Sequence, residues 1–268
     1  MTNYFNLAVV AIFKNEALYL KDWIEFHLKV GVEHFYLYNN NSSDNYREVL
    51  QPFKGVIDIY DWPIHPGQMQ AYADCVLTKA NTKWLAAIDI DEYLFPVKND
   101  NLSATLEAYD RPEISSLCVF WVIFGSDGKE IYEPIPAPIR FQFRCFGKGE
   151  TPHVKSIIRP DRVLVPPVNP HFFSPRPASS GQVVMHNVDE EFAVVEKAMA
   201  RIEKINIIRI NHYFTKSKQE WLVKYNRGKS STGGKKDFDH FNRINDQKRI
   251  EDTEILRFYK GFLAEKGT

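Results

Sequence analysis

A short apolar run that ends in three carboxylates constrains this chain more than any other feature. Residues 85–88 have the composition of a buried strand, and Asp89, Asp91 and Glu92 follow directly. Side chains two positions apart on a strand point to the same face, so we expect Asp89 and Asp91 to project together. Adjacent carboxylates repel each other unless a cation separates them, and a divalent cation shared with a diphosphate meets that requirement. The alternative is a solvated acidic turn.

Apolar runs and helical spacing alternate along the first hundred residues. The pattern predicts parallel strands joined by right-handed crossovers, which is a doubly wound α/β sheet. The expected strands are residues 7–13, 34–38, 56–60 and 85–88, and the expected helices are 19–30, 46–53 and 67–80.

A polar segment follows each of these strands. The four segments are residues 14–16, 39–44, 62–68 and 89–92. Because the carboxyl ends of parallel strands share one edge of a sheet, and open α/β sheets bind ligands there, we expect the four segments to line one site.

The remaining residues give weaker patterns. We expect helices at 102–109, 217–227 and 246–264, and strands at 117–124, 155–160, 163–165, 181–187 and 207–210, with 131–149 unassigned. Ser217 and Glu220 have the spacing of a capping box. The expected organisation is a nucleotide-binding half over about residues 1–98, an acceptor half over about 99–230, and a C-terminal helical extension over 231–268.

Composition excludes several classes of protein. The 34 Lys and Arg residues balance 34 Asp and Glu residues, so net charge does not indicate a nucleic-acid partner. Three widely spaced cysteines predict no disulfide framework. No apolar run is long enough for a signal peptide or a membrane span. We therefore expect a cytoplasmic location, and the basic residues from Lys216 onward leave open a contact with the inner face of a membrane.

Amides, hydroxyls and a carboxylate at the predicted edge suit hydrogen bonds to uracil and ribose. An ordinary Asn/Ser turn, and polar residues on a helix surface, are the alternatives. The residues concerned are Asn39, Asn40, Asn41, Ser42, Gln70 and Asp74.

His212 follows an apolar strand and precedes a basic stretch. A neutral imidazole there either completes a Mn²⁺ shell begun by Asp91 or has a structural role. The basic residues that follow either offset the charge of a leaving diphosphate or form a solvated helix face. They are Lys216, Lys218, Lys224, Arg227 and Lys229.

Several of these motifs resemble those of glycosyltransferases. Residues 38–44 resemble the Asp-Asp-Gly-Ser-Thr-Asp loop of family 2, and Asp89-Ile-Asp91 falls where the D-x-D motif of that family does. Glycosyltransferase family 92 is a closer match, over roughly residues 7–230. The shared motifs are Lys14-Asn-Glu16, Trp23-Ile-Glu-Phe-His27, Asp89-Ile-Asp-Glu92, Phe124-Gly125, Lys155-Ser-Ile-Ile-Arg-Pro160, Asn211-His-Tyr213, Lys216-Ser217 and Lys224 with Arg227-Gly228.

The resemblance implies a GT-A fold, in which a Rossmann-like nucleotide-sugar half and an acceptor half share one mixed sheet with C-terminal helices. It also implies Mn²⁺ or Mg²⁺ and a UDP-sugar donor, with UDP-galactose as one candidate. The implied reaction is an inverting transfer to a glycan or a lipid-linked glycan.

The resemblance further implies roles for individual residues. Asp89 would contact the ribose or the metal, Asp91 would bind the metal, and His212 would be the third ligand. The expected donor-binding residues are Asn15, Glu16, Asn39, Asn40, Asn41, Ser42, Gln70, Asp74, Asp89, Lys155 and Lys216.

One expected motif, the Glu-Asp base motif of family 2, is not found in this sequence. An inverting transfer needs a group that accepts the proton of the acceptor hydroxyl. Asp127 is the first candidate and Glu150 the second, although Ser-Asp-Gly is also an ordinary turn.

Two other functions stay open. A sugar nucleotidyltransferase also holds Mg²⁺ on carboxylates, but no glycine-rich phosphate loop follows the first strand here. A relative that binds a glycan without catalysis is the second alternative, and the acidic block together with Asn211-His-Tyr213 argues against it.

Overall fold

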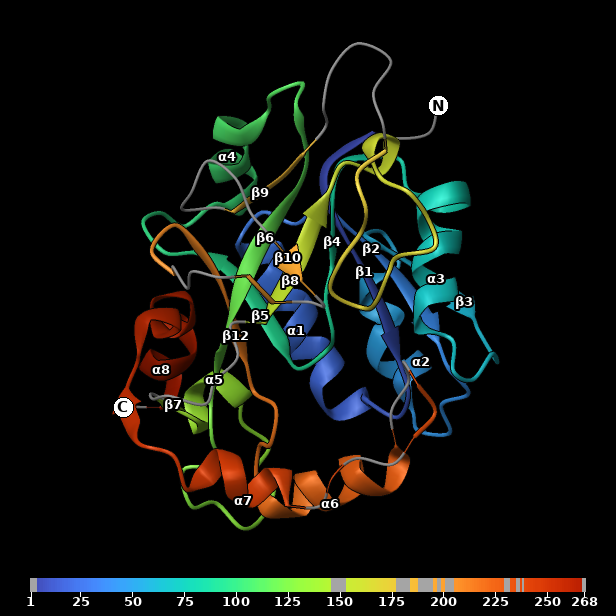
Figure 1. Ribbon diagram of the computed structural model, residues 1–268. Coiled ribbons are helices and arrows are strands. Elements are labelled where there is room, and N and C mark those ends of the chain that lie inside the picture. The colour runs from blue at the N-terminus through green and yellow to red at the C-terminus, as the bar shows by residue number, and fades with distance from the viewer. Residues whose placement is uncertain are drawn as a thin grey trace.

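The computed structural model describes residues 4–145, 153–176, 184–187, 195–196, 199–200, 205–228, 232–234, 237 and 239–266. One large sheet dominates it, with the strand order β3-β2-β1-β4-β8-β6-β12-β5 and with β9 paired to β6 (Figure 1). These strands are β1 (Phe5–Phe13), β2 (His34–Asn39), β3 (Ile57–Asp61), β4 (Thr82–Ala87), β5 (Glu92–Pro96), β6 (Ile114–Ile123), β8 (Val154–Ile158), β9 (Val184–Asn187) and β12 (Ile208–His212).

The pairing of the strands brings distant polar segments to one edge of the sheet. β2 and β4 are parallel to β1, β3 is parallel to β2, and β8 is antiparallel to both β4 and β6. β12 is parallel to β6 and antiparallel to β5. It follows that β1, β2, β3, β4, β6 and β12 end at the same edge, where β5 and β8 begin.

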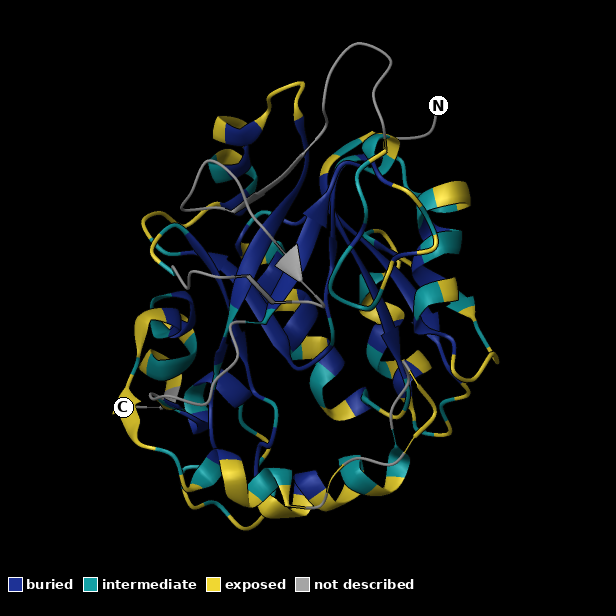
Figure 2. Cartoon of the chain, in the orientation of Figure 1, coloured by how far each residue is buried: buried dark blue, intermediate teal, exposed yellow. Residues whose placement is uncertain are grey.

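Helices cover both faces of the sheet, and the sheet separates two apolar cores. β1 alternates between them: Leu7, Val9, Ala11 and Phe13 enter the larger core, whereas Ala8, Val10 and Ile12 enter the smaller one. The larger core includes α1 (Ala17–Lys29), α2 (Tyr46–Leu50), α4 (Leu102–Leu106) and the 3₁₀ helix at Glu254–Tyr259, and the smaller includes α3 (Gln68–Asp74). The central strands are therefore buried on both faces, as Figure 2 shows, whereas the edge strand β3 is partly exposed.

Two aromatic side chains of α1 hold the end of the acidic turn. The indole Nε1 of Trp23 donates to the carbonyl oxygen of Glu92 at 2.8 Å. His27 Nδ1 lies 2.7 Å from the carbonyl oxygen of Trp23, and His27 Nε2 accepts from the backbone N–H of Leu94 at 3.2 Å. Burial lowers the pKa of His27 to about 3, so the imidazole is neutral. The Trp23–His27 motif thus has a structural role beside the site.

Replacement of Trp23 by phenylalanine should remove the donor to the Glu92 carbonyl and leave a small cavity. We expect the free energy of unfolding to fall by roughly 2–4 kcal/mol, because a buried carbonyl loses its partner and a core ring loses volume. Urea unfolding followed by circular dichroism measures this. A loss of only a few tenths of a kcal/mol would show that the indole does not support the turn.

Two C-terminal helices, α6 (Lys218–Arg227) and α7 (His240–Asn245), lie across the edge where β1 to β4, β6 and β12 end (Figure 1). α6 begins at a complete capping box, in which Ser217 Oγ accepts from the Glu220 N–H and the Glu220 carboxylate accepts from the Ser217 N–H. The side chains of Arg140 and Glu220 form a buried ion pair of 2.7 Å, which ties α6 to α5 (Ala137–Arg140). α7 and α8 (Lys260–Lys266) complete the C-terminal helices.

The mixed α/β sheet with C-terminal helices confirms the predicted fold class. Three local predictions were wrong. Residues 246–264 form β13 (Arg249–Glu251), which pairs with β7 (Phe143–Cys145), then the 3₁₀ helix and α8, so they are not one helix. Residues 163–165 make only a single bridge, from Val163 to Pro175. β5 was not expected, because Pro96 was taken as the end of the acidic motif.

The other predicted elements are present with shifted ends. The weak strand at 181–187 is seen as β9 over Val184–Asn187, and residues 181–183 lie outside the described part of the chain. A two-stranded sheet pairs β10 (Val195–Glu196) with β11 (Met199–Ala200). Within the described residues, no helix combines the length and the apolar character needed to cross a membrane.

Candidate functional site

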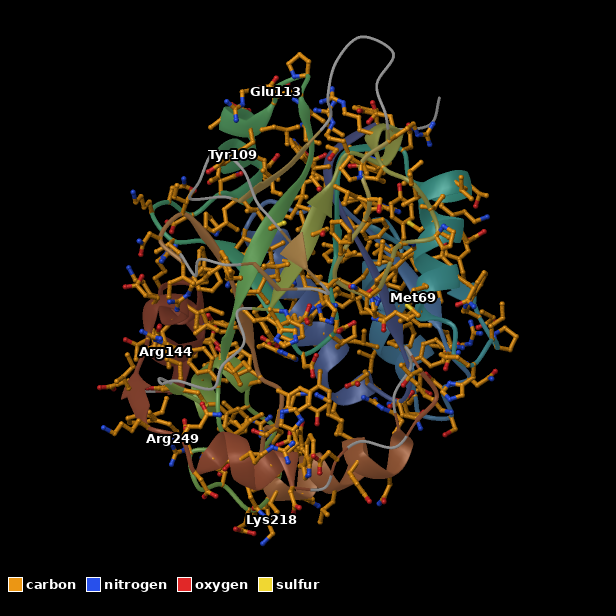
Figure 3. All side chains as sticks on the ribbon, in the orientation of Figure 1. Met69, Tyr109, Glu113, Arg144, Lys218 and Arg249 are labelled. Carbon is orange, nitrogen blue, oxygen red and sulfur yellow. The ribbon has the colours of Figure 1, made fainter. Side chains whose placement is uncertain are left out.

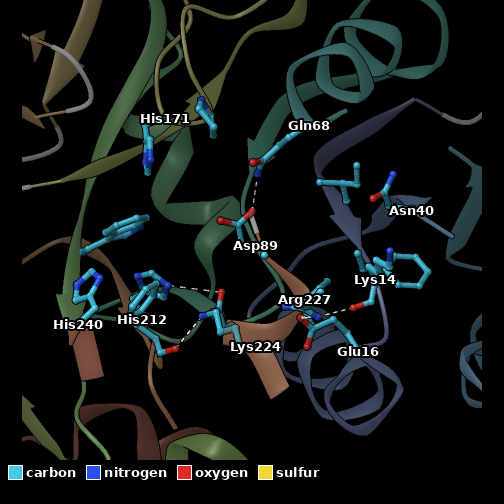
Figure 4. A pocket seen from close by; sticks show the side chains of 18 of the residues that line it. Lys14, Glu16, Asn40, Gln68, Asp89, His171, His212, Lys224, Arg227 and His240 are labelled. Atoms are coloured by element: carbon cyan, nitrogen blue, oxygen red, sulfur yellow. Dashed lines mark hydrogen bonds and ion pairs between the residues drawn. The ribbon is translucent and has the colours of Figure 1, made fainter. Parts of the chain in front are cut away.

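A cavity of about 400 Å³ opens at the edge where the parallel strands end (Figure 4). Its lining comes from segments that are far apart in the sequence but share this edge. The lining includes Phe13, Lys14, Glu16, Asn40, His65, Gln68, Asp89, Asp91, Trp121, His153, His171, His212, Phe214, Lys224, Arg227, Asp237 and His240.

Asp89 and Asp91 both reach the cavity, from the turn between β4 and β5. β4 ends at Ala87, so the two carboxylates leave the turn, and not the strand itself as expected. The Asp89 carboxylate accepts from Gln68 Nε2 at 2.8 Å and from Lys155 Nζ at 3.0 Å. The Lys155 side chain is 1% exposed and the Asp89 side chain 33%, so a buried ammonium meets a carboxylate that faces the cavity. Burial raises the pKa of Asp89, but the Lys155 ammonium outweighs this effect and the net shift is downward.

Glu92 lies behind the turn and is fully buried. Its Oε2 accepts from the backbone N–H of Asp89 at 3.0 Å and lies 3.6 Å from Lys155 Nζ. Burial raises the pKa of Glu92 well above its ordinary value despite the nearby Lys155. The hydrogen bond that Glu92 Oε2 accepts from the turn backbone gives this residue a positioning role.

Asp91 faces a different set of partners. Its carboxylate contacts the Lys224 ammonium, and Asp91 Oδ1 lies 3.5 Å from His212 Nε2. The backbone N–H of Tyr213 donates to the Asp91 carbonyl oxygen at 2.9 Å, which holds the turn against the end of β12. Burial would raise the pKa of Asp91, but Lys224 and His212 hold it well below its ordinary value. Asp91 is therefore an anion that lines the cavity.

The donor atoms at Asp91 and His212 fit a divalent cation. A spacing of 3.5 Å between a carboxylate oxygen and an imidazole nitrogen allows one ion to contact both. Burial lowers the pKa of His212, so its ring is neutral, and its buried Nδ1 has no hydrogen-bond partner among the described residues to fix the tautomer. No group of three or more His, Cys, Asp or Glu residues in the described ranges is arranged for a metal. The three-residue set of Asp89, Asp91 and His212 stays a prediction.

Arg227, at the last turn of α6, lies at the opposite end of the cavity from the histidines (Figure 4). Its guanidinium contacts the Glu16 carboxylate and the carbonyl oxygen of Lys14. Nearby, Asn40 Nδ2 donates to the carbonyl oxygens of Trp62 and Ile64, both at 2.7 Å. Arg227 thus joins the end of β1 to α6, and Asn40 joins the end of β2 to the segment after β3.

The other polar side chains around the loop at residues 39–44 form hydrogen bonds with the loop and with neighbouring segments. Asn39 Nδ2 donates to Asp61 at 2.8 Å, and Asn39 Oδ1 accepts from the Ser42 N–H at 2.9 Å. Asn15 Oδ1 accepts from the Ser43 N–H at 2.7 Å. Asn39, Asn41 and Ser42 also line a second, more open depression of about 570 Å³ beside the cavity.

Four residues at this edge have left-handed backbone conformations. Asn15, Asn41, Asp127 and Lys216 have φ values of 52°, 56°, 50° and 52°, and they follow β1, β2, β6 and β12 respectively. Residues other than glycine pay a conformational cost there, and such strain tends to gather at functional sites. The loops that turn the chain at this edge are therefore held by their surroundings.

Four more predicted site residues lie outside the cavity lining, in addition to Asn15, Asn39, Asn41, Ser42 and Lys155 described above. Gln70 is exposed on α3, and Asp74 accepts from the Tyr38 hydroxyl at 2.7 Å. The Lys216 ammonium lies 3.5 Å from the ring centre of Tyr19. Asp127 Oδ2 accepts from the backbone N–H groups of Gln142 and Phe143 at 2.6 and 3.3 Å. These contacts give Asp74 and Asp127 structural partners, and the roles predicted for all four stay predictions.

Glu150, the second candidate for the base, lies outside the described residues. Sequence reasoning also missed part of the cavity, namely its wall of aromatic rings. Trp121 lies 5.3, 4.9 and 4.3 Å from the ring centres of His153, His171 and His212. The Nδ1 atom of His171 lies 3.0 Å from the Val154 carbonyl oxygen. Burial and the nearby Lys155 ammonium lower the pKa of His171 to about 3.

The fold and cavity define an α/β protein whose ligand site lies at the carboxyl ends of its strands. The sequence model of glycosyltransferase family 92 matches residues 7–255, so the chain belongs to that family. A family 92 protein of rice (Oryza sativa subsp. japonica) is 32% identical over 162 residues, which are 58% of this chain and 27% of the relative. One of castor bean (Ricinus communis) is 26% identical over 162 residues, 58% of this chain and 29% of the relative. These matches span less than a third of each relative.

Solved structures with some likeness include residues 1–349 of S. aureus TarS. It has a TM-score of 0.37 at 12% identity, over 58% of this chain and 47% of that one. Another is GalNAc-T7, solved with UDP, GalNAc and Mn²⁺, with a TM-score of 0.38 at 13% identity, over 59% of this chain and 35% of that one. Likeness of this degree does not locate residues of the site.

Proposed function

We propose that this chain transfers a sugar from a UDP-sugar to a glycan or lipid-linked glycan, with a divalent cation and with inversion. The observation that carries the proposal is the cavity itself. It holds the anionic Asp91 beside His212, and basic groups from Lys224 and Arg227 on one helix. A nucleoside diphosphate with a bound cation needs both kinds of group within a few ångströms.

In this proposal the two ends of the cavity bind different parts of the donor. The uridine would lie by Lys14, Glu16 and Asn40, where the end of β1 meets Arg227. Asp91 and His212 would hold the cation, which would supply positive charge to the departing diphosphate. Lys155 neutralises Asp89 and Arg227 neutralises Glu16, so the acidic side chains do not repel the incoming phosphates.

The acceptor would enter beside the aromatic wall of Trp121, His153 and His171. Imidazole rings and an indole offer hydrogen bonds and apolar ring faces, a combination that suits sugar hydroxyls and C–H groups. Asp127 and Glu150 stay the predicted bases for the acceptor hydroxyl. UDP-galactose is the first donor to try.

Calorimetric titration of UDP into the purified protein tests the proposal. We expect binding in the presence of Mn²⁺ that is lost or greatly weakened in EDTA, followed by slow hydrolysis when UDP-sugars are supplied. Absence of UDP binding with Mn²⁺, with Mg²⁺ and with no metal would contradict a UDP-sugar donor. It would leave a family 92 chain that uses another donor or binds a glycan without catalysis.

A further inference from the structure

Lys224 occupies the space in which Asp91 would meet a cation. Its ammonium contacts the Asp91 carboxylate, donates to the Phe214 carbonyl oxygen at 2.8 Å and lies 4.1 Å from the Phe214 ring centre. The side chain is 14% exposed and comes from the last turn of α6; Figure 4 shows it between His212 and Arg227. Lys224 is therefore a cation already bound at Asp91.

Each aspartate of the acidic turn is paired with a lysine. Asp89 has Lys155 as its partner and Asp91 has Lys224. A divalent ion that joined Asp91 while the ammonium stayed would place two cations against one carboxylate, and like charges at such a distance repel strongly. Metal binding at Asp91 therefore requires the ammonium to move away.

The surroundings of Lys224 allow its side chain to move while the helix stays. The first turn of α6 is held by the capping box and by the Arg140–Glu220 ion pair, whereas a lysine side chain rotates about four bonds. Arg227 is three positions further along the helix, so it shares a face with Lys224, and both line the cavity. The proposed diphosphate site is in the same cavity, so a released Lys224 ammonium does not have to leave the cavity to meet the diphosphate.

We propose that the Lys224 ammonium and a divalent cation compete for Asp91, and that the displaced ammonium then pairs with the donor diphosphate. The inference rests on the proposed function, because it needs a diphosphate in the cavity. Its consequence is that cation and donor bind tightly only together. The cation alone must expel Lys224 without compensation, whereas the diphosphate gives the ammonium a new partner.

Replacement of Lys224 by methionine separates the effect of the ammonium on cation binding from its effect on diphosphate binding. Methionine keeps the apolar stem against Phe214 but has no charge. We expect Mn²⁺ alone, titrated by electron paramagnetic resonance, to bind the variant about tenfold more tightly than wild type, and UDP at saturating Mn²⁺ to bind about tenfold more weakly. Lys218→Met is the matched control, since Lys218 is on the same helix with a side chain 55% exposed, at the outer edge of the molecule (Figure 3).

If Lys224 only supported the fold, its replacement would not change the affinities for Mn²⁺ and UDP in opposite directions. Equal weakening of both ligands in Lys224→Met, or unchanged Mn²⁺ affinity, would overturn the inference. Lys224→Gln repeats the test with a polar side chain if circular dichroism shows that the methionine variant is not folded. Wild-type protein that binds no UDP under any metal condition would instead contradict the proposed function, so the two failures are distinguishable.

Discussion

Asp91→Asn should abolish the metal dependence of UDP binding. The substitution keeps the shape of the side chain but removes the anionic oxygen beside His212, and asparagine is a poor ligand for a hard cation. We expect UDP affinity at saturating Mn²⁺ to fall by at least about a hundredfold, since loss of even an outer-shell partner of a metal ligand costs 10–100-fold. Calorimetry with Mn²⁺ and with EDTA measures the effect.

Asp100→Asn is a suitable control for this experiment. The Asp100 side chain is 80% exposed, pairs with Arg257 at 3.0 Å and is not part of the cavity lining. Its affinity for UDP should equal that of wild type. If Asp91→Asn also bound UDP with wild-type affinity and metal dependence, Asp91 would not be a ligand of the cation, and Asp89 would have to be tested in its place.

The second large effect should be on stability, at the buried pair of Arg140 and Glu220. Glu220→Gln removes one charge of this pair, whose side chains are 1% and 5% exposed, and leaves the guanidinium without its counter-charge. Breaking a buried pair from one side costs about 3–5 kcal/mol. Urea unfolding at pH 7 should show a loss of this size, and UDP affinity should fall as well because α6 carries Lys224 and Arg227.

The same pair predicts how stability depends on pH. Burial would raise the pKa of Glu220, but hydrogen bonds from Arg140 and Ser217 lower it from 4.5 to about 2. A carboxyl group with a depressed folded-state pKa stabilises the fold above its unfolded pKa, and this contribution is lost as the pH falls from about 4.5 to about 2. The lost contribution is about 3 kcal/mol. The stability difference between wild type and Glu220→Gln should therefore shrink across this window.

An exposed pair on α1 provides the comparison. Glu25→Gln removes an exposed ion pair with Lys21, which lies four residues earlier on the helix at a distance of 4.0 Å. The loss of unfolding free energy should therefore stay below about 0.5 kcal/mol at every pH. A Glu220→Gln loss as small as this, or one that does not change between pH 4.5 and 2, would show that the Arg140–Glu220 pair does not anchor α6.

Local patterns were enough to predict the first half of the sheet and the edge that carries the site. Apolar runs located β1 to β4, and the rule that parallel strands end together brought Lys14, Asn40 and Asp89 into one cavity. His212 was also placed at this edge from a strand followed by a polar residue. These successes rest on periodicity and on sheet topology, which are readable over short windows.

The partners of the carboxylates could not be predicted in the same way. Lys155 meets Asp89 only because β8 inserts antiparallel between β4 and β6, and a pairing between residues 66 positions apart leaves no local signal. Lys224 was seen as one member of a basic run, but its contact with Asp91 depends on where α6 crosses the sheet. Asp127 lies in a Ser-Asp-Gly turn, and its carboxylate accepts a hydrogen bond from the backbone N–H of Gln142.

The antiparallel insertion of β8 has a consequence for the order of folding. β1 to β4 form contacts over short and moderate separations, but β4 meets β6 only through β8, and β5 pairs with β12 from more than a hundred residues later. Closure of such long loops is slow, because their entropy is lost before the contacts are gained. During synthesis, Asp91 is made long before its two neighbours in the site, His212 and Lys224. The complete site can therefore form only after most of the chain has left the ribosome.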